Sequence, residues 1–303
     1  MEILHLLESI RFPAMDEAML LITQLGEETA FLVTALIVFW CVDKRKGYFL
    51  MSVGFLGTML NQFLKLLFAI PRPWVLNPEL TIVEAAREAA AGYSFPSGHS
   101  QNAVGTFGGL AAVTENKWVR RLCVAAAVLV PFSRMYLGVH TPQDVLVGSG
   151  MALLLVFVLR PLTVAGKELP MKATIAIMLT VAVGLLMYVE MHSFPVDMDP
   201  HNLASGQKNA YTMLGCLIGV AIVYVAEKKY VQFETKAIWW AQILKAALGL
   251  GCVLLVKEGL RSPLEMLLPV YPARAVRYFL VVITAGLLWP MSFRWFSKLG
   301  EKK

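Results

Sequence analysis

The sequence predicts an all-α protein that crosses a membrane several times. Of its 303 residues, 57% are apolar and 16% are charged, whereas an average globular chain is about 45 to 50% apolar and about 25% charged. The apolar residues gather in long segments, and the basic residues gather in alternate loops. This combination is typical of helical membrane proteins and excludes disordered and coiled-coil chains.

Nine apolar segments are long enough to be membrane helices, since about 20 residues cross the hydrocarbon core. They are 27–43, 47–70, 97–114, 119–137, 142–164, 171–190, 208–226, 237–256 and 275–296. Residues 2–12 and 79–91 have helix-forming composition but carry charges, so we expect interfacial or loop helices there. No linker or repeat divides the chain, which predicts a single domain over residues 1–303.

The basic residues predict the orientation. Most of them lie in five groups on one side of the predicted spans: Lys44, Arg45 and Lys46; Lys117, Arg120 and Arg121; Arg160, Lys167 and Lys172; Lys228, Lys229 and Lys236; Arg294, Lys298, Lys302 and Lys303. Cytoplasmic loops carry such an excess, so we expect the N-terminus outside and the C-terminus in the cytoplasm. The net charge of +6 is therefore assigned to these loops and not to nucleic-acid binding.

The four cysteines each lie in a long apolar segment and have no close-spaced partner. A disulfide framework or a structural zinc site is therefore not expected. The N-terminal stretch is acidic where a signal peptide is basic, so no removed targeting peptide is expected.

Ionisable side chains near a bilayer usually mark a functional site, and here they cluster in three places. Lys65 precedes Arg72-Pro73 at the end of the second predicted span, the segment 93–99 opens the third, and the segment 133–144 joins the fourth to the fifth. The charge-derived topology places all three at the outer face. We therefore expect them to form one site.

The residue types in these three segments suit a phosphate. Lys65, Arg72 and Arg134 supply three cations, and arginine can clamp phosphate oxygens with two parallel hydrogen bonds. Ser97 and Gly98 stand where the third span begins, so a capping hydroxyl and free backbone amides are expected at a positive helix end. Gly98 would also let phosphate oxygens approach the backbone.

Two histidines accompany the cations. His140 precedes Thr141-Pro142, which predicts the start of a helix with Asp144 in its first turn. His99 follows Gly98 in the second segment. With two imidazoles, one group can attack phosphorus while the other transfers protons.

These positions resemble the signature of the type 2 phosphatidic acid phosphatase superfamily. That signature is Lys-x6-Arg-Pro, then Pro-Ser-Gly-His, then Ser-Arg-x5-His-x3-Asp. The chain matches it at Lys65, Arg72, Pro73, Pro96, Ser97, Gly98, His99, Ser133, Arg134, His140 and Asp144. The resemblance covers residues 65–144 and implies a phosphatase helix bundle built from the second to fifth spans with later helices. The predicted span count is similar to that of the glucose-6-phosphatase and sphingosine-phosphate phosphatase branches.

The resemblance also implies the roles of the catalytic residues. His140 would attack phosphorus to form a phosphohistidine, Asp144 would orient His140, and His99 would act as general acid and then base. Lys65, Arg72, Ser97, Gly98 and Arg134 would bind the phosphate. No carboxylate cluster suited to a metal accompanies them, so we expect metal-independent activity without a cofactor.

The sequence therefore predicts a membrane phosphatase that removes the terminal phosphate of a lipid phosphate or diphosphate at the outer face. Membrane lipids are its expected surroundings, and the sequence leaves the oligomeric state open. Three alternatives remain: a phosphotransferase acting on the same phosphohistidine, a phosphatase of a small soluble phosphoester, and an anion or lipid transporter.

Two features near the signature bear on the substrate. Trp74 and Tyr93 are interpreted as interfacial anchors, with a role at the site entrance as the alternative. The segment 191–207 is interpreted as a surface loop, with a cap over the site as the alternative. Its Asp197, Asp199 and His201 suggest a metal site only weakly, because no further ligand accompanies them.

Overall fold

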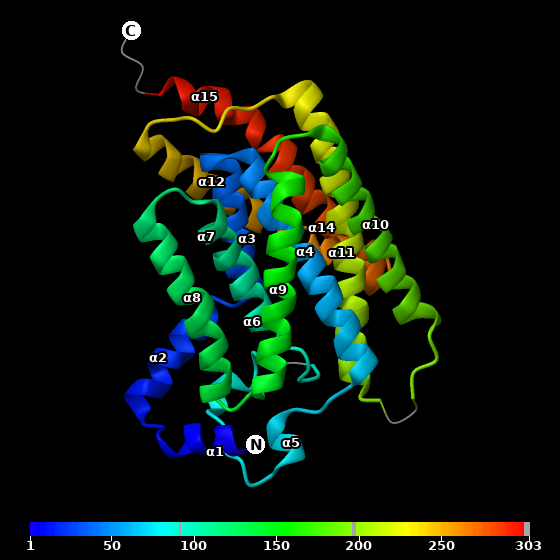
Figure 1. The fold of residues 1–303 in the computed structure, drawn as a ribbon. Helices are drawn as coiled ribbons and strands as arrows, with labels where there is room; N and C mark the ends of the chain where they lie inside the picture. Colours follow the sequence, from blue (N-terminus) through cyan, green and yellow to red (C-terminus); the bar gives the residue numbers. More distant parts are fainter. Residues whose placement is uncertain (91, 196–197, 300–303) are drawn as a thin grey trace. The chain divides into compact units, whose positions relative to one another are not determined.

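The computed structural model describes residues 1–90, 92–195 and 198–299, and these residues form helices and loops without a strand (Figure 1). The α-helices are α1 (Glu2–Ser9), α2 (Pro13–Gln24), α3 (Glu28–Ile37), α4 (Lys44–Phe68), α5 (Pro73–Leu76), α6 (Gly98–Ala103), α7 (Gly109–Val113), α8 (Lys117–Tyr136), α9 (Pro142–Thr163), α10 (Glu168–Met191), α11 (Pro200–Ala226), α12 (Trp239–Gly259), α13 (Arg261–Leu267), α14 (Val270–Ile283) and α15 (Phe293–Lys298). Four π-helical turns, η1 (Val38–Val42), η3 (Val104–Gly108), η4 (Glu227–Val231) and η5 (Thr284–Leu288), and two 3₁₀ turns, η2 (Glu84–Ala86) and η6 (Pro290–Ser292), complete them. The prediction of an all-α chain is confirmed.

The chain folds as two compact units. Unit 1 contains Met1–Thr34, Phe49–Pro161 and Ser193–Gly206, and unit 2 contains Ala35–Tyr48, Leu162–His192 and Gln207–Lys303. All predicted site residues lie in unit 1. The single domain over residues 1–303 stays a prediction.

Six helical stretches are long and apolar enough to cross a membrane. They are Lys44–Leu76, Pro142–Thr163, Glu168–Met191, Pro200–Val231, Trp239–Leu267 and Val270–Lys298. The pair Pro13–Gln24 and Glu28–Val42 is bent by 51° and would make a seventh if it is one broken span. The described residues therefore support six or seven candidate spans, and not the predicted nine.

Two of the predicted spans are not long or apolar enough to be among these candidates. Residues 97–114 form α6, η3 and α7 over Gly98–Val113, which is shorter than the about 20 residues that a straight crossing requires. Residues 119–137 form α8, which carries Lys117, Arg120, Arg121 and Arg134. A helix with so many cations is not apolar enough to count as a membrane span by its composition.

The two predicted interfacial helices differ in outcome. Residues 2–12 contain α1, as expected. Residues 79–91 were predicted to be helical, but the described part holds only the short turn η2. Backbone hydrogen bonds tie this segment to its neighbours instead: Val83 N donates to Leu137 O at 3.1 Å.

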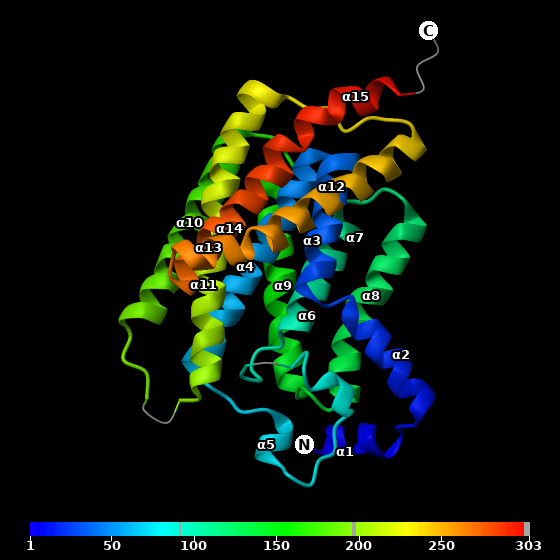
Figure 2. The same cartoon turned by 180° about the vertical axis from the view of Figure 1, so that it is seen from behind.

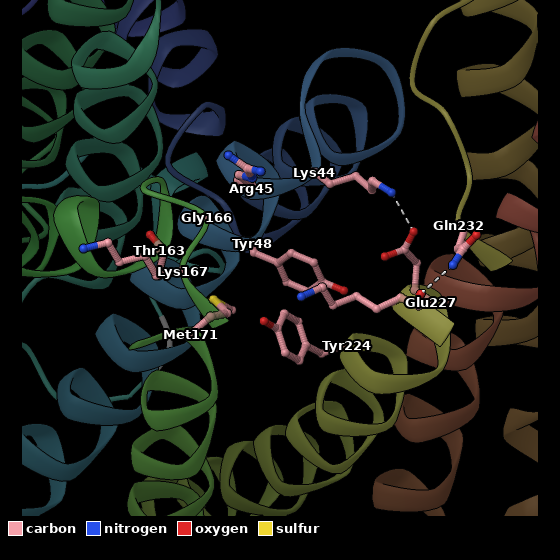
Figure 3. Close-up of a pocket in the computed structure, with 11 residues that line it drawn as sticks. Lys44, Arg45, Tyr48, Thr163, Gly166, Lys167, Met171, Tyr224, Glu227 and Gln232 are labelled. Carbon is pink, nitrogen blue, oxygen red and sulfur yellow. Dashed lines mark hydrogen bonds and ion pairs between the residues drawn. The ribbon is translucent and has the colours of Figure 1, made fainter. Parts of the chain in front are cut away.

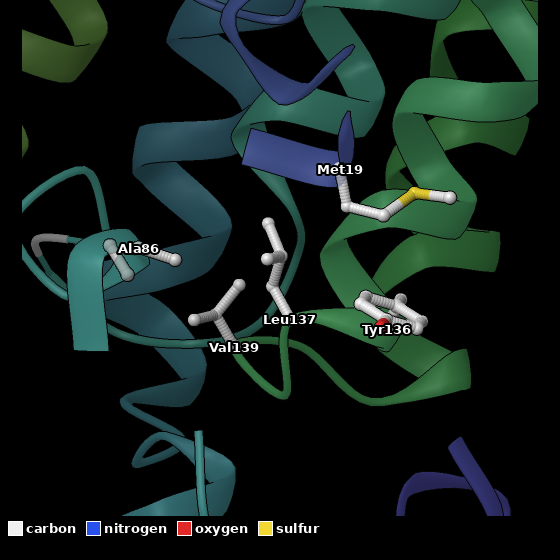
Figure 4. Close-up of a cluster of buried hydrophobic side chains, with 6 residues drawn as sticks. Met19, Ala86, Tyr136, Leu137 and Val139 are labelled. Carbon is white, nitrogen blue, oxygen red and sulfur yellow. The ribbon is translucent and has the colours of Figure 1, made fainter. Parts of the chain in front are cut away.

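A small apolar cluster in unit 1 fixes the chain just before His140. It comprises Met19, Ala86, Ala90, Tyr136, Leu137 and Val139, and Figure 4 shows the side chains of Met19 and Ala86 facing those at the end of α8. The Tyr136 hydroxyl also donates to Asp16 Oδ1 of α2 at 2.8 Å. These contacts hold α2 and the 83–90 segment against the end of α8.

In unit 2, α12 contacts both α14 and α15 (Figure 2). The buried aromatic residues of this unit meet edge to face; Trp40 and Phe293 are one such pair, with ring centroids 6.4 Å apart. The Trp40 indole donates to Ala285 O at 2.8 Å, which satisfies its only polar atom. Cys41, Cys123, Cys216 and Cys252 are free thiols.

Candidate active site

A tight turn carries the chain from α8 to His140. Gly138 has φ of 81°, a backbone conformation that L side chains rarely adopt. A Cβ there would also lie 2.8 Å from Nη2 of Arg11. Arg11 fixes this turn by donating from Nε to Tyr136 O at 2.8 Å and from Nη1 to Thr81 O at 2.7 Å.

His140 and Asp144 lie together in the interior of unit 1, where each is at most 2% exposed. Nδ1 of His140 is 3.4 Å from Oδ2 of Asp144. Thr141 and Asp144 cap the start of α9 reciprocally: Thr141 N donates to Asp144 Oδ2 at 2.8 Å, and Asp144 N donates to Thr141 Oγ1 at 3.2 Å. The predicted helix start therefore holds the carboxylate one turn from the imidazole.

Ser94 makes a further contact with this carboxylate. Its hydroxyl donates to Asp144 Oδ2 at 2.6 Å and lies 3.5 Å from His140 Nδ1. Three groups therefore converge on Oδ2: a hydroxyl, a backbone amide and the imidazole. This convergence fixes the carboxylate in one orientation.

Arg72 also contacts the His140 ring, and it lies closer to Nε2 than to Nδ1, which is 3.5 Å from its Nη1. Its Nη1 lies 2.8 Å from Nε2 of His140 and donates to Val139 O at 3.0 Å, and its Nε donates to Gly92 O at 2.9 Å. A guanidinium only donates hydrogen bonds, so Nε2 is the unprotonated nitrogen. The proton then sits on Nδ1, which faces Asp144.

The electrostatic environment keeps the imidazole neutral. Burial, followed by the charges of Arg72, Arg134, Lys65 and His99, lowers the pKa of His140 well below its ordinary value. A neutral imidazole with its lone pair on Nε2 is the form that can act as a nucleophile.

Arg134 is fully buried at the other side of the site. Its Nη1 donates to the Thr23 hydroxyl of α2 at 2.9 Å. Its Nε and Nη2 have no hydrogen-bond partner among the described residues, and neither has Nε2 of His99. No described carboxylate forms an ion pair with Arg134. Buried donors without partners are rare, and these match the needs of an anion.

The remaining predicted phosphate ligands surround the start of α6. Ser97 is the N-cap: its Oγ accepts from Ser100 N at 3.4 Å, while its own amide donates to Asp144 O at 3.0 Å. A Cβ on Gly98 would meet only Asn61 Oδ1 at 3.6 Å, so packing of the protein does not require glycine there. Lys65, in the last turn of α4, donates to Tyr93 O.

A cleft of about 640 Å³ in unit 1 shares one lining residue, Arg72, with this site. Trp74 and Tyr93 also line it. The segment 191–207 contributes Pro195, Met198 and Asp199 before α11, and His201 and Asn202 from the first turn of α11, which begins at Pro200 where the sequence predicts a loop. These residues therefore form a wall of the cleft. The interpretation of Trp74 and Tyr93 as interfacial anchors only, and of the segment 191–207 as a surface loop only, is incomplete.

The described residues contain no group of three or more His, Cys, Asp or Glu side chains that could hold a metal ion. Within the segment considered above, His201 N donates to Asp199 Oδ1 at 2.8 Å, which caps the start of α11. Asp197 lies outside the described residues, as do Lys302 and Lys303.

Comparison with known proteins identifies the family. Residues 45–168 match the model of the PAP2 superfamily, and residues 211–302 match that of the PAP2 superfamily phosphatase transmembrane extension. An undecaprenyl-diphosphatase of Sulfolobus acidocaldarius is 30% identical over 48% of this chain and 70% of that protein. The phosphatidylglycerophosphatase B of Bacillus subtilis is 31% identical over 50% of this chain and 76% of that protein. The chain belongs to the PAP2 superfamily.

This membership confirms the resemblance predicted from the signature, and the chain is a phosphatase of the PAP2 superfamily and an integral membrane protein. A solved structure, the first transmembrane PAP2-type phosphatidylglycerolphosphate phosphatase from Bacillus subtilis, is 29% identical and matches 55% of this chain and 86% of its own, with a TM-score of 0.46.

Three contributors to the PAP2 site were missed by sequence analysis. Ser94 binds Asp144, Thr23 binds Arg134, and Asn61 donates from Nδ2 to Pro96 O at 3.3 Å. Ser94 lies three residues before Ser97, so its place inside the second segment was a usable signal. Thr23 is 111 residues from Arg134, and no local pattern links them.

Proposed function

We propose that this protein hydrolyses the terminal phosphate of a lipid phosphate or diphosphate through a phosphohistidine, without a metal ion. One observation carries the proposal: Arg134 is fully buried, and among the described residues its Nε and Nη2 have no hydrogen-bond partner, and neither has Nε2 of His99. Leaving a buried charge uncompensated is costly. A phosphate group between these donors and Arg72 would supply the missing charge and acceptors.

The first chemical step uses the lone pair on Nε2 of His140. A phosphate entering the site offers Arg72 charged acceptors, which are stronger than the neutral Nε2 that it now contacts. The freed Nε2 attacks phosphorus, and the bond from phosphorus to the leaving oxygen breaks. His99, protonated once the negative charge of the phosphate enters among the cations, donates a proton to that oxygen. Asp144 stabilises the positive charge that the imidazole gains.

The second step reverses these proton transfers. His99 removes a proton from water, the resulting hydroxide attacks phosphorus, and the nitrogen–phosphorus bond breaks. The electron pair returns to Nε2 of His140, and inorganic phosphate leaves. Lys65, Arg72 and Arg134 stabilise the charge on the phosphoryl oxygens in both steps.

The cleft and the membrane favour a lipid substrate. Trp74, Val75 and Met198 give the cleft an apolar lining beside Arg72, so that a headgroup can reach the cations while its chain stays among apolar groups. The relatives named above are, by name, an undecaprenyl-diphosphatase and a phosphatidylglycerophosphatase.

We propose the outer face of the membrane as the place of catalysis, because the loops that carry most cations belong to the other side. The helices predicted at 97–114 and 119–137 belong to this proposal as membrane-embedded elements. An impermeant thiol reagent should label a cysteine introduced at the exposed Ser193 in intact cells, and one at the exposed Lys236 only after lysis. The reverse pattern would place catalysis in the cytoplasm.

A phosphate-release screen tests the activity. Purified protein should release phosphate from lipid monophosphates or diphosphates without an added acceptor and in the presence of EDTA. Release only after an acceptor alcohol is added would identify a phosphotransferase, and release from sugar phosphates alone would identify the soluble-substrate alternative. Loss of activity in EDTA that magnesium restores would contradict the metal-free mechanism.

A further inference from the structure

Unit 2 contains a pocket that is distinct from the phosphatase site. It has a volume of about 310 Å³, at the lower end of the range of small-molecule sites. Its lining residues come from the start of α4, the end of α9, the start of α10 and the segment between these two helices, the end of α11, η4 and the residue that follows η4. The lining has four cations, Lys44, Arg45, Lys167 and Lys228, and a single acid, Glu227.

The acid of the pocket is already neutralised. Glu227 is 3% exposed, and Lys44 Nζ lies 2.7 Å from its Oε1 and donates to Phe233 O at 2.9 Å. This pair forms one wall of the pocket. Figure 3 shows the rings of Tyr48 and Tyr224 between this wall and the loop that carries Gly166 and Lys167; the ring centroids are 5.5 Å apart.

Two of the cations have no acidic partner. Lys228 is paired with Glu168 outside the pocket. By contrast, the side chains of Arg45 and Lys167 make no ion pair with any described acid. The pocket therefore has an uncompensated positive charge of two.

The position of Arg45 depends on Gly166. Gly166 has φ of 72°, and a Cβ there would lie 2.3 Å from Cζ of Arg45. The guanidinium thus packs directly against the glycine backbone, and any larger residue would displace it. The loop is shaped around this cation.

We infer that this pocket binds a phosphate-bearing anion, with Arg45 and Lys167 as its ligands. All four cations belong to loops that the distribution of basic residues assigns to the cytoplasm. Basic pockets between membrane helices on that side bind the headgroups of anionic lipids. Two sources of the ligand share this chemistry: the phosphodiester headgroup of a cytoplasmic-leaflet lipid, and free phosphate.

The test is direct binding to the purified full-length protein in detergent. Phosphatidylglycerol, which has no terminal phosphate to hydrolyse, is titrated against phosphatidylcholine, and binding is followed by native mass spectrometry. Inorganic phosphate is titrated separately and followed by thermal shift. The variant is Arg45→Gln with Lys167→Gln. The control is Lys229→Gln with Arg294→Gln, which removes two exposed cations of unit 2 outside the pocket.

The double variant should bind phosphatidylglycerol at least about 10-fold more weakly than the control, since each basic residue near an anionic headgroup contributes about fivefold. If inorganic phosphate alone shows this difference, the source is soluble phosphate. Lys167→Glu, a single exposed substitution, should weaken binding in the same direction. Equal affinity of variant and control, or equal binding of phosphatidylcholine, would overturn the inference.

Discussion

The Ser94 hydroxyl donates to Oδ2 of Asp144 at 2.6 Å, on the same oxygen that lies 3.4 Å from Nδ1 of His140. Ser94 is therefore a positioning residue: it holds the carboxylate that holds the proposed nucleophile. Because the partners that orient a catalytic group are commonly worth about 10-fold or more, Ser94→Ala should lower kcat by about 10-fold with little change in KM.

Ser149→Ala is the matched control for Ser94, because the buried Ser149 hydroxyl has no hydrogen-bond partner among the described residues. Its activity should equal that of the wild type, as measured by initial rates of phosphate release. Equal rates for the two alanine variants would show that Ser94 does not position Asp144.

Replacement of the two site histidines should separate the two chemical steps. His140→Asn should abolish phosphate release and the acid-labile, base-stable phosphoprotein. His99→Asn should also abolish release of phosphate from a lipid phosphate. With p-nitrophenyl phosphate, whose leaving group needs no proton, His99→Asn should still form the phosphoprotein and accumulate it, because no base activates water.

Labelling with ³²P-substrate and acid–base stability of the label provide the measurement. His192→Ala is the control and should retain wild-type activity, since His192 lies in unit 2 and outside the site. A phosphoprotein in His140→Asn would assign the nucleophile to another residue.

Replacement of Arg134 should raise the stability of the protein and lower its activity. Two nitrogens of the buried Arg134 guanidinium have no hydrogen-bond partner among the described residues, so Arg134→Met should remove a buried charge that lacks an ion pair and raise Tm by a few degrees. The same change should lower kcat/KM by about 100-fold or more, because a cation that stabilises the transition state is lost.

Vanadate or inorganic phosphate should raise the Tm of the wild type but not of Arg134→Met, as followed by differential scanning fluorimetry. A fall in Tm on substitution, with the phosphate-dependent rise unchanged, would contradict the assignment of Arg134 as a phosphate ligand.

Stability should depend on pH through His140. Its pKa is lowered in the folded state by burial and neighbouring cations, whereas the unfolded chain titrates near about 6.5. The unfolded state therefore binds more protons below that pH, and stability is lost as pH falls through about 6.5 towards the folded pKa. Each such proton contributes at most about 1.4 kcal/mol per pH unit.

Thermal unfolding of wild type and His140→Asn from pH 7.5 to 5.5 checks this expectation. The wild type should lose more stability than the variant over the acidic part of the range. Parallel curves would show that His140 is not held neutral by the fold.

The apolar cleft should distinguish lipid from soluble substrates. Trp74 lines the cleft, and the guanidinium carbon of Arg87 lies 5.1 Å from the centre of its ring. Trp74→Ala should raise KM several-fold for a long-chain lipid phosphate and leave KM for a short soluble phosphoester unchanged, since only the long chain contacts this wall.

Trp118→Ala is the control for the cleft, because Trp118 is 62% exposed on α8 and does not line it. Steady-state kinetics with substrates of both kinds provide the measurement. An equal rise in KM for the lipid in both variants would assign Trp74 to general contact with the membrane.

Local sequence predicted the elements whose formation depends on neighbours along the chain. Length and hydropathy identified helices α4, α9, α10, α11, α12 and α14, because a helix that lies in hydrocarbon must itself be apolar over most of its length. The same rule overcounted the spans at α6 to α7, which together are too short for a straight crossing, and at α8, which carries four basic residues.

The sequence by itself determined the helical membrane class, the PAP2 superfamily, and the paired positions of His140 and Asp144 about one helical turn apart. Tertiary structure decided that Thr23 supports Arg134, that Ser94 holds Asp144, and that residues before and at the start of α11 line the cleft. The physical reason is the separation along the chain of the residues that interact. Helix starts and apolar periodicity depend on residues a few positions apart, whereas a hydrogen bond between residues 111 positions apart exists only once the chain has folded.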